Sequence, residues 1–529
     1  MGGRRACGEP RGGVARGCAL KESDEKPVGG SGADGRLGDV PVEEFRAALH
    51  RAADWVADYR EHVEGRRVSP GSLPGEVAAL LPGAMPESPS PLSELFDELD
   101  RVVLPHVVNW GHPSFLGYFG STTTAPGILG EFIAAALNVS AMTWRTSPAA
   151  TELESVVLGW MRRALGLPEE FTGVVYDTAS VALLHALAAA REGLGLDVRR
   201  RGLAGRADVP TLRVYASEQA HSSIEKAAIT LGLGEENVRR VATDERFRMD
   251  AGALRREIEE DLGAGALPLA VVATTGTTSA AACDPVEEIA ALCREHGVWL
   301  HVDAAYGGAL AMLAEYGHVA RALAAADSLV VNPHKWLFVP LDFSALYTRR
   351  PELLRQTFSL VPEYLRGDAE RGEVNYMDYG VQLGRRFRAL KAWAVFKTFG
   401  RAGLESRIRE HLRLARHFAR GVGELEGFEL AAPPEMAVVC FRALPAPNPG
   451  ATSTEAAEAT DATDARADEL NRALVEAVNA TGRAYLTHTT LRGRVAARVA
   501  VGNVLTEERH LDALLTLLRE EAARLTGRV

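Results

Sequence analysis

The two segments VWLHVDAAY (residues 298–306) and SLVVNPHKW (residues 328–336) decide the fold of this chain. Each begins with a short apolar run that predicts a buried strand, and each continues into small or polar residues typical of a turn. The first strand ends in Asp303, and Lys335 follows the second. Because buried strands of this kind run parallel, we expect both charged side chains at the carboxyl edge of one sheet, where ligands of open α/β sheets bind.

Further strands and helices alternate along the chain before these two segments. The pattern predicts helices over 180–193 and 284–297, the second with Asp284 as its N-cap and a stop at Gly297. Such alternation predicts a mostly parallel α/β sheet with helices on both faces. The other strand candidates are GVVYD (173–177), TLRVYAS (211–217) and LAVVATT (269–275).

The C-terminal part of the chain has a different character. Long helical patterns at 403–425 and 507–525 surround the apolar runs MAVVCFRAL (436–444) and VAARVAVG (495–502), which predicts a second, smaller α+β domain. Within it, residues 445–469 are rich in Ala, Thr, Asp and Pro, a composition typical of a flexible surface insertion.

Composition divides the N-terminal part into two segments. Residues 1–40 are rich in Gly and charge and short of large apolar residues, which predicts a disordered extension. A helical apolar pattern begins at Val42 and is followed by many Pro and Gly residues, so 41–126 are expected to be helical and rich in loops. The helix must pack either on the core or on a partner subunit. The large α/β domain then spans 127–400 and the small domain 401–529.

The charge balance narrows the class of partner. The chain has 529 residues, with 59 basic and 70 acidic side chains and a net charge of −11. This acidic balance repels phosphate backbones, so a small molecule fits better than a nucleic acid. The five cysteines include no CxxC pair, which fits neither a disulfide framework nor a metal site and favours a reducing, cytoplasmic location. No apolar run approaches the ~20 residues of a membrane span, so no membrane partner is expected.

Asp303 and Lys335 together match the needs of one cofactor. Pyridoxal phosphate (PLP) binds a lysine amine as a Schiff base and needs an acidic partner for its ring nitrogen. Its phosphate needs an anion site, and a predicted strand, turn and helix place Thr178, Ala179 and Ser180 at a helix start, where free N–H groups attract anions. Taken singly, such residues are more often helix caps, turn residues or solvated charges. Their order on the strands of one sheet favours the cofactor.

Landmark segments along the chain carry a family resemblance. They are NWGHPSFLGYF (109–119), SPAATELE (147–154), YASEQAHSSIEKA (215–227), ATTGTT (273–278), HVDAAYGG (301–308), NPHKW (332–336), LGRRFRALK (383–391) and RVAVGN (498–503). With them, the sequence from about Val42 to the C-terminus resembles the group II pyridoxal-phosphate-dependent amino-acid decarboxylases of the aromatic-L-amino-acid decarboxylase type. The resemblance implies an aspartate-aminotransferase-like fold (PLP fold type I) with a mostly parallel seven-stranded sheet. It also implies a homodimer with its active site at the subunit interface, and an N-terminal segment that packs on the partner subunit.

The resemblance implies a role for each matching position. Lys335 matches the Schiff-base lysine, Asp303 the partner of the ring nitrogen, and His221 a histidine that stacks on the cofactor ring. Ala305 would face the ring closely, where only a small side chain fits. The positions that match the phosphate site are Thr178, Ala179, Ser180, Asn332 and His334, and Thr278 matches a threonine close to cofactor and substrate.

The proton donor is implied in the same way. After CO2 leaves, a proton must reach Cα, and a positioned acid is needed to deliver it. In this family the acid is a tyrosine on a mobile loop, and Tyr364 in SLVPEYLRGDAERGE (359–373) occupies the matching place. Related aldehyde synthases, which consume oxygen, carry Phe at this position, so Tyr364 favours decarboxylation.

Aromatic positions imply the class of substrate. Trp110, Tyr118, Phe119 and Trp144 resemble pocket positions of the family, some of which reach across the subunit interface, and Gly384 matches a site that leaves room for a bulky side chain. The implied substrates are tryptophan, 5-hydroxytryptophan, dopa, phenylalanine or tyrosine.

Three positions depart from the family pattern. Asp177 stands beside the phosphate turn where many relatives have Gly, Met142 replaces a common aromatic residue, and Gly120 replaces a common proline. These departures leave two further activities open: an aromatic aldehyde synthase, or a decarboxylase of glutamate, 2,4-diaminobutyrate or histidine. A non-catalytic binding homologue is a more remote alternative, which the intact Lys335 disfavours.

Overall fold

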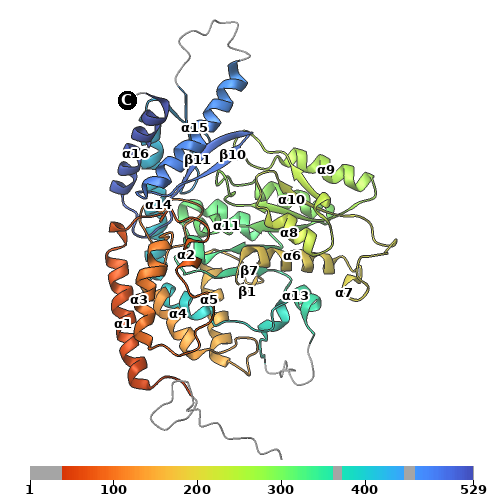
Figure 1. Cartoon of the computed structure of the whole chain (residues 1–529). Coiled ribbons are helices and arrows are strands. Elements are labelled where there is room, and N and C mark those ends of the chain that lie inside the picture. Colours follow the sequence, from red (N-terminus) through yellow and green to blue (C-terminus); the bar gives the residue numbers. More distant parts are fainter. Residues whose placement is uncertain (1–37, 361–371, 446–458, 528–529) are drawn as a thin grey trace, which may run out of the picture. The chain divides into compact units, whose positions relative to one another are not determined.

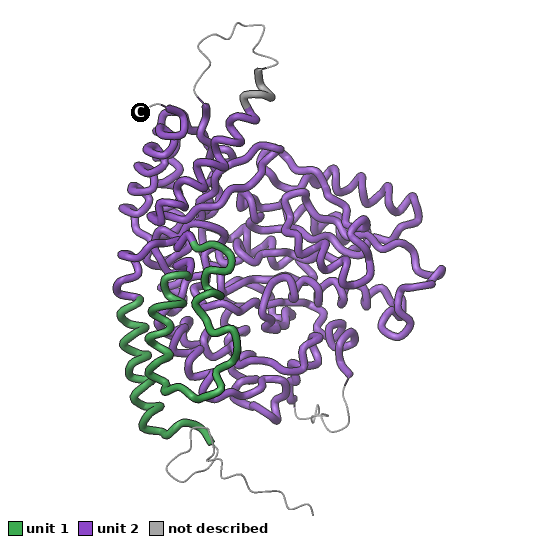
Figure 2. The backbone as a smooth tube through the Cα atoms, in the orientation of Figure 1, with its two compact units in different colours: residues 1–59, 72–106 green, residues 60–71, 107–529 purple. Residues whose placement is uncertain are grey.

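The computed structural model describes residues 38–360, 372–445 and 459–527. The chain divides into two compact units, one of Met1–Tyr59 and Ser72–His106 and the other of Arg60–Gly71 and Val107–Val529 (Figure 2). Residues 1–37, the greater part of the predicted extension, lie outside the described residues.

The first unit contains most of the helix that was predicted to begin at Val42. This helix, α1 (Val42–Glu61), buries none of its residues. Inside the unit, Arg51 Nη2 lies 2.5 Å from Asp97 Oδ1, and Trp55 Nε1 donates a hydrogen bond to Asp100 Oδ1 at 2.8 Å. These bonds join α1 to α3 (Leu92–Glu98) and the turn after it, while α2 (Glu76–Ala79) lies on the connection between them.

The second unit is built on a seven-stranded sheet with the strand order β1-β7-β6-β5-β4-β2-β3. Strands β2 to β6 pair in parallel, whereas β7 runs antiparallel to both β1 and β6. The predicted mostly parallel seven-stranded sheet is therefore confirmed. The strands are β1 (Thr172–Tyr176), β2 (Leu212–Ser217), β3 (Val238–Val241), β4 (Leu267–Thr274), β5 (Trp299–Asp303), β6 (Ser328–Val331) and β7 (Ser344–Thr348).

Helices cover both faces of this sheet (Figure 1), because successive side chains of a buried strand point to opposite faces. Val174 and Tyr176 of β1 belong to one apolar cluster with α6, α8 and α13, whereas Val175 belongs to another with α5, α9, α10 and α11. These helices are α5 (Pro148–Ala164), α6 (Ala179–Gly193), α8 (Ser223–Thr230), α9 (Ala251–Gly263), α10 (Val286–His296), α11 (Gly317–Ala324) and α13 (Pro351–Phe358), with the short α7 (Val198–Arg201) and α12 (Pro333–Trp336) in the connections.

A second, four-stranded antiparallel sheet has the order β10-β11-β9-β8. Both sheets belong to the same compact unit. The domain boundary predicted at residue 400 stays a prediction, and the backbone of α14 leaves helical geometry at Gly400 (φ 61°, ψ 171°). The elements of this part are α14 (Ala389–Glu424), β8 (Phe428–Leu430), β9 (Val438–Ala443), α15 (Ala459–Thr481), β10 (Thr487–Leu491), β11 (Arg494–Ala500) and α16 (Glu508–Thr526).

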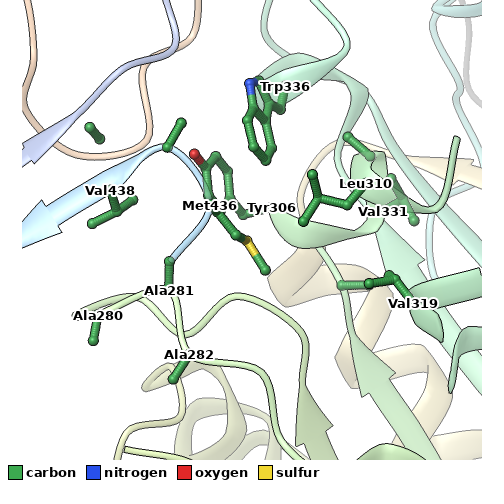
Figure 3. Packing of buried hydrophobic residues seen from close by; sticks show 14 of the residues in the cluster. Ala280, Ala281, Ala282, Tyr306, Leu310, Val319, Val331, Trp336, Met436 and Val438 are labelled. Carbon is green, nitrogen blue, oxygen red and sulfur yellow. The ribbon is translucent and has the colours of Figure 1, made fainter. Parts of the chain in front are cut away.

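Met436 joins the two sheets. It lies just before β9 and packs in the buried cluster that also contains Tyr306 (Figure 3). A Cβ atom added to Gly307 would come within 2.6 Å of Met436 Cε, and one added to Gly276, whose φ is +91°, within 3.1 Å of Met436 Sδ. A Cβ on Gly307 would also lie 2.5 Å from the backbone oxygen of Thr275, so this position needs glycine because backbone and methionine together fill the space, and the positive φ of Gly276 favours glycine there.

Two expectations from the sequence were wrong in part. Asp284 does not cap its own helix, because the N-cap position of α10 is Pro285. Asp284 is buried instead, and its two carboxylate oxygens accept the N–H groups of Met249 and Thr274, both at 2.7 Å. The predicted insertion at 445–469 is helical from Ala459 onward, where α15 begins, and residues 446–458 lie outside the described residues.

Helix α4 (Ala125–Leu137) has two contrasting faces. One face packs tightly on α14: a Cβ on Gly130 would lie 2.6 Å from the Cα atom of Lys391. The other face exposes large apolar side chains, which are Leu129, Phe132, Ile133 and Leu137. None of the helices in the described part of the chain is long and apolar enough to span a membrane.

Candidate active site

The two residues that anchor the predicted site lie at the carboxyl edge of the seven-stranded sheet. Asp303 is the last residue of β5, and Lys335 lies in α12, the helical turn that follows β6. Ala305 N donates to Asp303 Oδ1 at 3.0 Å, Asn332 N donates to Ala305 O at 3.1 Å, and Lys335 N donates to Asn332 O at 2.9 Å. This chain of hydrogen bonds ties the two connections together at the edge where ligands of such sheets bind.

The amine of Lys335 lies in aromatic surroundings. Its Nζ is 5.0 Å from the centroid of the Phe119 ring. Burial lowers the pKa of Lys335, the carboxylate of Asp303 acts in the opposite direction, and Arg498 lowers the pKa further. A lowered pKa gives more of the neutral amine, the form that attacks a carbonyl carbon. Phe119, predicted as a pocket residue, thus lies at the lysine itself.

His221 lies between β2 and α8. Its Nδ1 accepts the N–H of Ser223 at 3.0 Å, which leaves Nε2 to carry the proton of the neutral ring. Partial burial lowers the pKa of His221, Asp303 raises it, and Lys335 lowers it. The three predicted residues therefore share one electrostatic neighbourhood, in which a neutral imidazole is suited to stack on an aromatic ring.

The predicted phosphate turn opens α6, with Thr178 as the N-cap. Asp177 is tied back within the same turn: its Oδ1 accepts the N–H of Thr178 at 2.8 Å, and its Oδ2 accepts Nε2–H of Gln382 at 3.5 Å. The first N–H groups of a helix have no partner inside the helix. Ala179 and Ser180 lie at these positions and are suited to bind an anion.

Asn332 and His334 follow β6 and are 4% and 6% exposed. Asn332 Oδ1 is buried and has no hydrogen-bond partner among the described residues. His334 Nδ1 accepts the N–H of Phe343 at 3.0 Å, and burial lowers the pKa of His334 to about 4. Its ring is therefore neutral and can donate through Nε2. Thr278 is exposed on the loop after β4.

Arg498 of β11 is a site residue that the sequence did not predict. Its Nε donates to Ser279 O at 3.1 Å and its Nη1 to Tyr118 O at 2.5 Å, while Cζ lies 4.6 Å from the Phe119 ring centroid. Nη2 is buried and has no hydrogen-bond partner in the described part of the chain. The sequence signal that could have found it is an arginine inside an apolar run, since a charge in a buried strand needs a partner.

Two consecutive aromatic residues point into different surroundings. Phe119 stacks on Tyr306 with 3.9 Å between ring centroids, and Tyr306 stacks on Trp336 at 4.6 Å (Figure 3). Tyr118 stacks instead on Trp110 at 5.7 Å, and both of these rings are exposed. Phe119 therefore forms the inner aromatic wall beside Lys335, while Trp110 and Tyr118 form an outer pair.

The remaining predicted pocket residues lie in other surroundings. Trp144 N donates a hydrogen bond to Asn375 Oδ1 at 3.1 Å, and its Nε1 donates one to Glu152 Oε1 at 2.8 Å. Gly384 borders a cavity of about 410 Å³ between the C-terminal half of α4 and residues 384–388. Tyr364 lies outside the described residues.

The residues at the sheet edge fit the group that the sequence predicts. Nearly all buried polar atoms in folded proteins have a hydrogen-bond partner. Asn332 Oδ1, Arg498 Nη2 and Thr274 Oγ1 at the end of β4 are buried and without a partner among the described residues. Beside them, Lys335 offers an amine with a lowered pKa to a carbonyl carbon, and Asp303 offers a carboxylate to a ring nitrogen, so the set suits a polar ligand that has both groups.

Comparison with known proteins identifies the family. A family model of the pyridoxal-dependent decarboxylase conserved domain matches residues 74–444. Tryptophan decarboxylase 2 of Oryza sativa subsp. japonica is 37% identical over 511 residues, which cover 95% of this chain and 99% of that protein. Phenylacetaldehyde synthase of Arabidopsis thaliana is 35% identical over 499 residues, covering 92% and 98%. The crystal structure of Oryza sativa TDC with PLP and tryptamine has a TM-score of 0.86 at 36% identity, covering 93% of this chain and 100% of that one.

The chain belongs to the pyridoxal-dependent decarboxylase family. It is a PLP-dependent decarboxylase with the aspartate-aminotransferase-like fold. The predicted family, fold class, enzyme class and cofactor are thereby confirmed.

Proposed function

We propose that this protein decarboxylates an aromatic L-amino acid, releasing the arylalkylamine and CO2. The observation that carries the proposal is the amine of Lys335 beside the Phe119 ring, near Asp303 and near the Nη2 of Arg498, which has no partner among the described residues. The candidate substrates are tryptophan, 5-hydroxytryptophan, dopa, phenylalanine and tyrosine. The relatives that decarboxylate tryptophan support this choice of substrate class.

Each residue of the site has a proposed role toward the cofactor. Bound PLP supplies an electron sink for the electron pair that remains when CO2 leaves. Lys335 holds PLP covalently, Asp303 keeps the ring nitrogen protonated, His221 stacks on one ring face, and Ala305 leaves room at the ring. The phosphate is held by Thr178, Ala179, Ser180, Asn332 and His334, and Thr278 lies close to cofactor and substrate.

Arg498 is proposed to orient the substrate. Its Nη2 has N–H groups to offer to a carboxylate, and its other nitrogens are fixed by Ser279 and Tyr118. A rigid donor of this kind can hold the carboxylate at a defined angle to the cofactor ring. Phe119 then excludes water on that side, and Tyr364 delivers the proton to Cα.

The protein is proposed to act as a homodimer. Helix α1 buries none of its residues within the chain, and the outer face of α4 exposes Phe132 and Ile133 at 49% and 47%. Exposed apolar faces of this kind mark protein–protein contacts. Trp144 bonds to Asn375 and Glu152, and the cavity beside Gly384 is not lined by Lys335, so in this proposal both residues serve the partner's site, and the segment 41–126 packs on the partner. The cysteines of the described residues are free thiols, which supports the cytoplasm as the location.

A product assay tests the proposed activity. Purified protein with added PLP is incubated with each aromatic amino acid, and amine, aldehyde, CO2 and hydrogen peroxide are measured. One arylalkylamine with stoichiometric CO2 is the expected result, and Lys335→Ala should lose both turnover and the yellow colour of the lysine-bound cofactor. Consumption of glutamate, 2,4-diaminobutyrate or histidine alone would contradict the substrate class. Absence of any product would support the non-catalytic alternative.

The phenylacetaldehyde synthase among the relatives supports a second candidate, an aromatic aldehyde synthase. Aldehyde with peroxide in the same assay would identify it. Under the proposed function, Tyr364→Phe should retain cofactor binding while amine formation falls and aldehyde appears. Unchanged amine output from this variant would rule out Tyr364 as the proton donor.

A further inference from the structure

A buried ion pair lies outside the site described so far. Arg385 Nη2 lies 2.6 Å from Glu154 Oε1, and the two side chains are 4% and 2% exposed. Burying two charges removes them from water, and this desolvation cost must be offset by their mutual attraction and their other hydrogen bonds. Apart from the ion pair itself, Glu154 and Arg385 make hydrogen bonds to backbone groups, and these bonds give the pair a structural role.

The ion pair hydrogen-bonds the backbone of strand β1 at Val175. The N–H of Val175 donates to Glu154 Oε1 at 3.1 Å, and the carbonyl of Val175 accepts Arg385 Nη2–H at 2.8 Å. Strand β1 is an edge strand whose neighbour in the sheet is β7. The two side chains therefore take the place of a missing neighbouring strand, just before the chain enters the turn at Thr178.

Arg385 also hydrogen-bonds the backbone of a second segment, at Ala141. Its Nη1 donates to the carbonyl of Ala141 at 3.0 Å, and its own carbonyl accepts the N–H of Ala141 at 2.8 Å. The next carbonyl, of Met142, accepts the N–H of Met377 at 3.0 Å. The segment 141–144, which ends in Trp144, is thus fixed to the same guanidinium that fixes β1.

We propose that Arg385 and Glu154 are a positioning pair that couples the phosphate turn of the cofactor site to the pocket-wall segment 141–144. The proposal rests on the proposed function, which takes Thr178–Ser180 as the phosphate turn and Trp144 as a pocket residue. Because one planar group holds both backbones, a shift of β1 on phosphate binding moves or orders segment 141–144 as well. In the proposed dimer, cofactor binding in one subunit would thereby order the pocket wall that serves the other.

Hydrogen exchange of the full-length protein, with and without PLP, tests the coupling. In the wild type, PLP should slow the exchange of amides in 176–182 and also in 139–146, each by about tenfold, the size of a typical coupling between sites. In Glu154→Gln, PLP should still slow 176–182, while 139–146 should change by less than about twofold. Arg385→Lys, which keeps the charge but cannot hold both carbonyls, should behave in the same way and carries the test if Glu154→Gln does not fold.

Arg442→Lys is the matched control. Arg442 of β9 in the second sheet is also a buried arginine, 1% exposed, and its Nη1 lies 2.9 Å from Asp468 Oδ1 of α15. Arg442→Lys should lose stability as Glu154→Gln and Arg385→Lys do, but PLP should still slow hydrogen exchange in both segments. The coupling would be overturned if PLP slowed hydrogen exchange in 176–182 but not in 139–146 of the wild type. It would also be overturned if PLP slowed exchange in both segments of Glu154→Gln. Either result would leave the proposed function intact. Slowing of neither segment in the wild type would overturn the proposed function as well.

Discussion

The Nη2 atom of Arg498 is the basis of a prediction about how a single residue binds the substrate. It is buried without a partner among the described residues, and it lies in the guanidinium whose Cζ is 4.6 Å from the Phe119 ring. If it binds the substrate carboxylate, Arg498→Lys should lose a charged hydrogen bond worth about 1.5–3 kcal/mol, roughly a tenfold to hundredfold fall in kcat/KM. Steady-state kinetics on the best aromatic substrate measure this fall.

Measuring the affinity for PLP distinguishes a loss of substrate binding from general damage to the site. Arg498→Lys should keep its PLP affinity, because the guanidinium of Arg498 contacts Ser279 and Tyr118 rather than the phosphate turn. Equal losses in PLP affinity and in kcat/KM would argue against an interaction with the substrate. An unchanged KM for the amino acid would argue against it as well.

At the scale of elements, α4 separates packing within the chain from packing between chains. Its inner face meets α14 through Gly130, and its outer face exposes Phe132 at 49%. Phe132→Arg places a charge in the proposed dimer interface. We expect it to weaken the dimer by at least about thirtyfold, the equivalent of ~2 kcal/mol for a central interface residue. Sedimentation velocity over a concentration series measures the change, and the activity per chain should fall with the dimer fraction.

Ile229→Arg is the control for this element. Ile229 is 53% exposed on α8, away from α4, so its replacement adds the same charge to another apolar surface site. The Ile229→Arg variant should sediment with the same mass as the wild type. A wild type that sediments as a monomer, or a Phe132→Arg variant that remains fully dimeric, would show that this face of α4 is not the interface.

At the scale of the whole molecule, four buried histidines set the response to acid. Burial lowers the pKa of His185, His301, His334 and His411 to about 4 each. Between pH 6.5 and 4 the unfolded chain therefore binds more protons than the folded chain. Stability should fall as the pH is lowered through this window, by about 1.4 kcal/mol per pH unit for each histidine. Burial raises the pKa of Asp284 to about 6 and also raises the pKa of Asp327 and Glu257, so these carboxyls act in the opposite direction and offset part of the fall.

The midpoint of urea unfolding between pH 7 and 5 measures this response. His411→Gln provides the matched variant, because Gln can accept from Trp336 Nε1 and donate to Asn503 O, as His411 does at 3.0 and 3.1 Å. Its stability should depend on pH less steeply, by about one proton or ~1.4 kcal/mol per pH unit. An identical slope in the two proteins would show that His411 is not neutral in the folded state.

The sequence by itself determined the strand that ends in Asp303, the strand that precedes Lys335, and the helix start near Thr178, because these features depend on local patterns of apolar residues and caps. The order of the parallel strands then required Asp303 and Lys335 to share one edge. The same local reasoning misplaced Asp284, whose carboxylate meets Met249 and Thr274 through the fold and not its own helix.

Only the tertiary structure decided which distant residues meet. Arg498 reaches Phe119, and Arg385 joins Val175 to Ala141, through contacts between segments hundreds of positions apart, as in the 380 residues between Tyr118 and Arg498. It also gave Trp144 and Gly384 neighbours other than Lys335, which are Asn375 for Trp144 and the cavity beside α4 for Gly384. The physical reason is that a motif fixes the geometry of its own backbone, whereas a buried charge or aromatic ring takes its partners from whatever the packed sheets bring beside it.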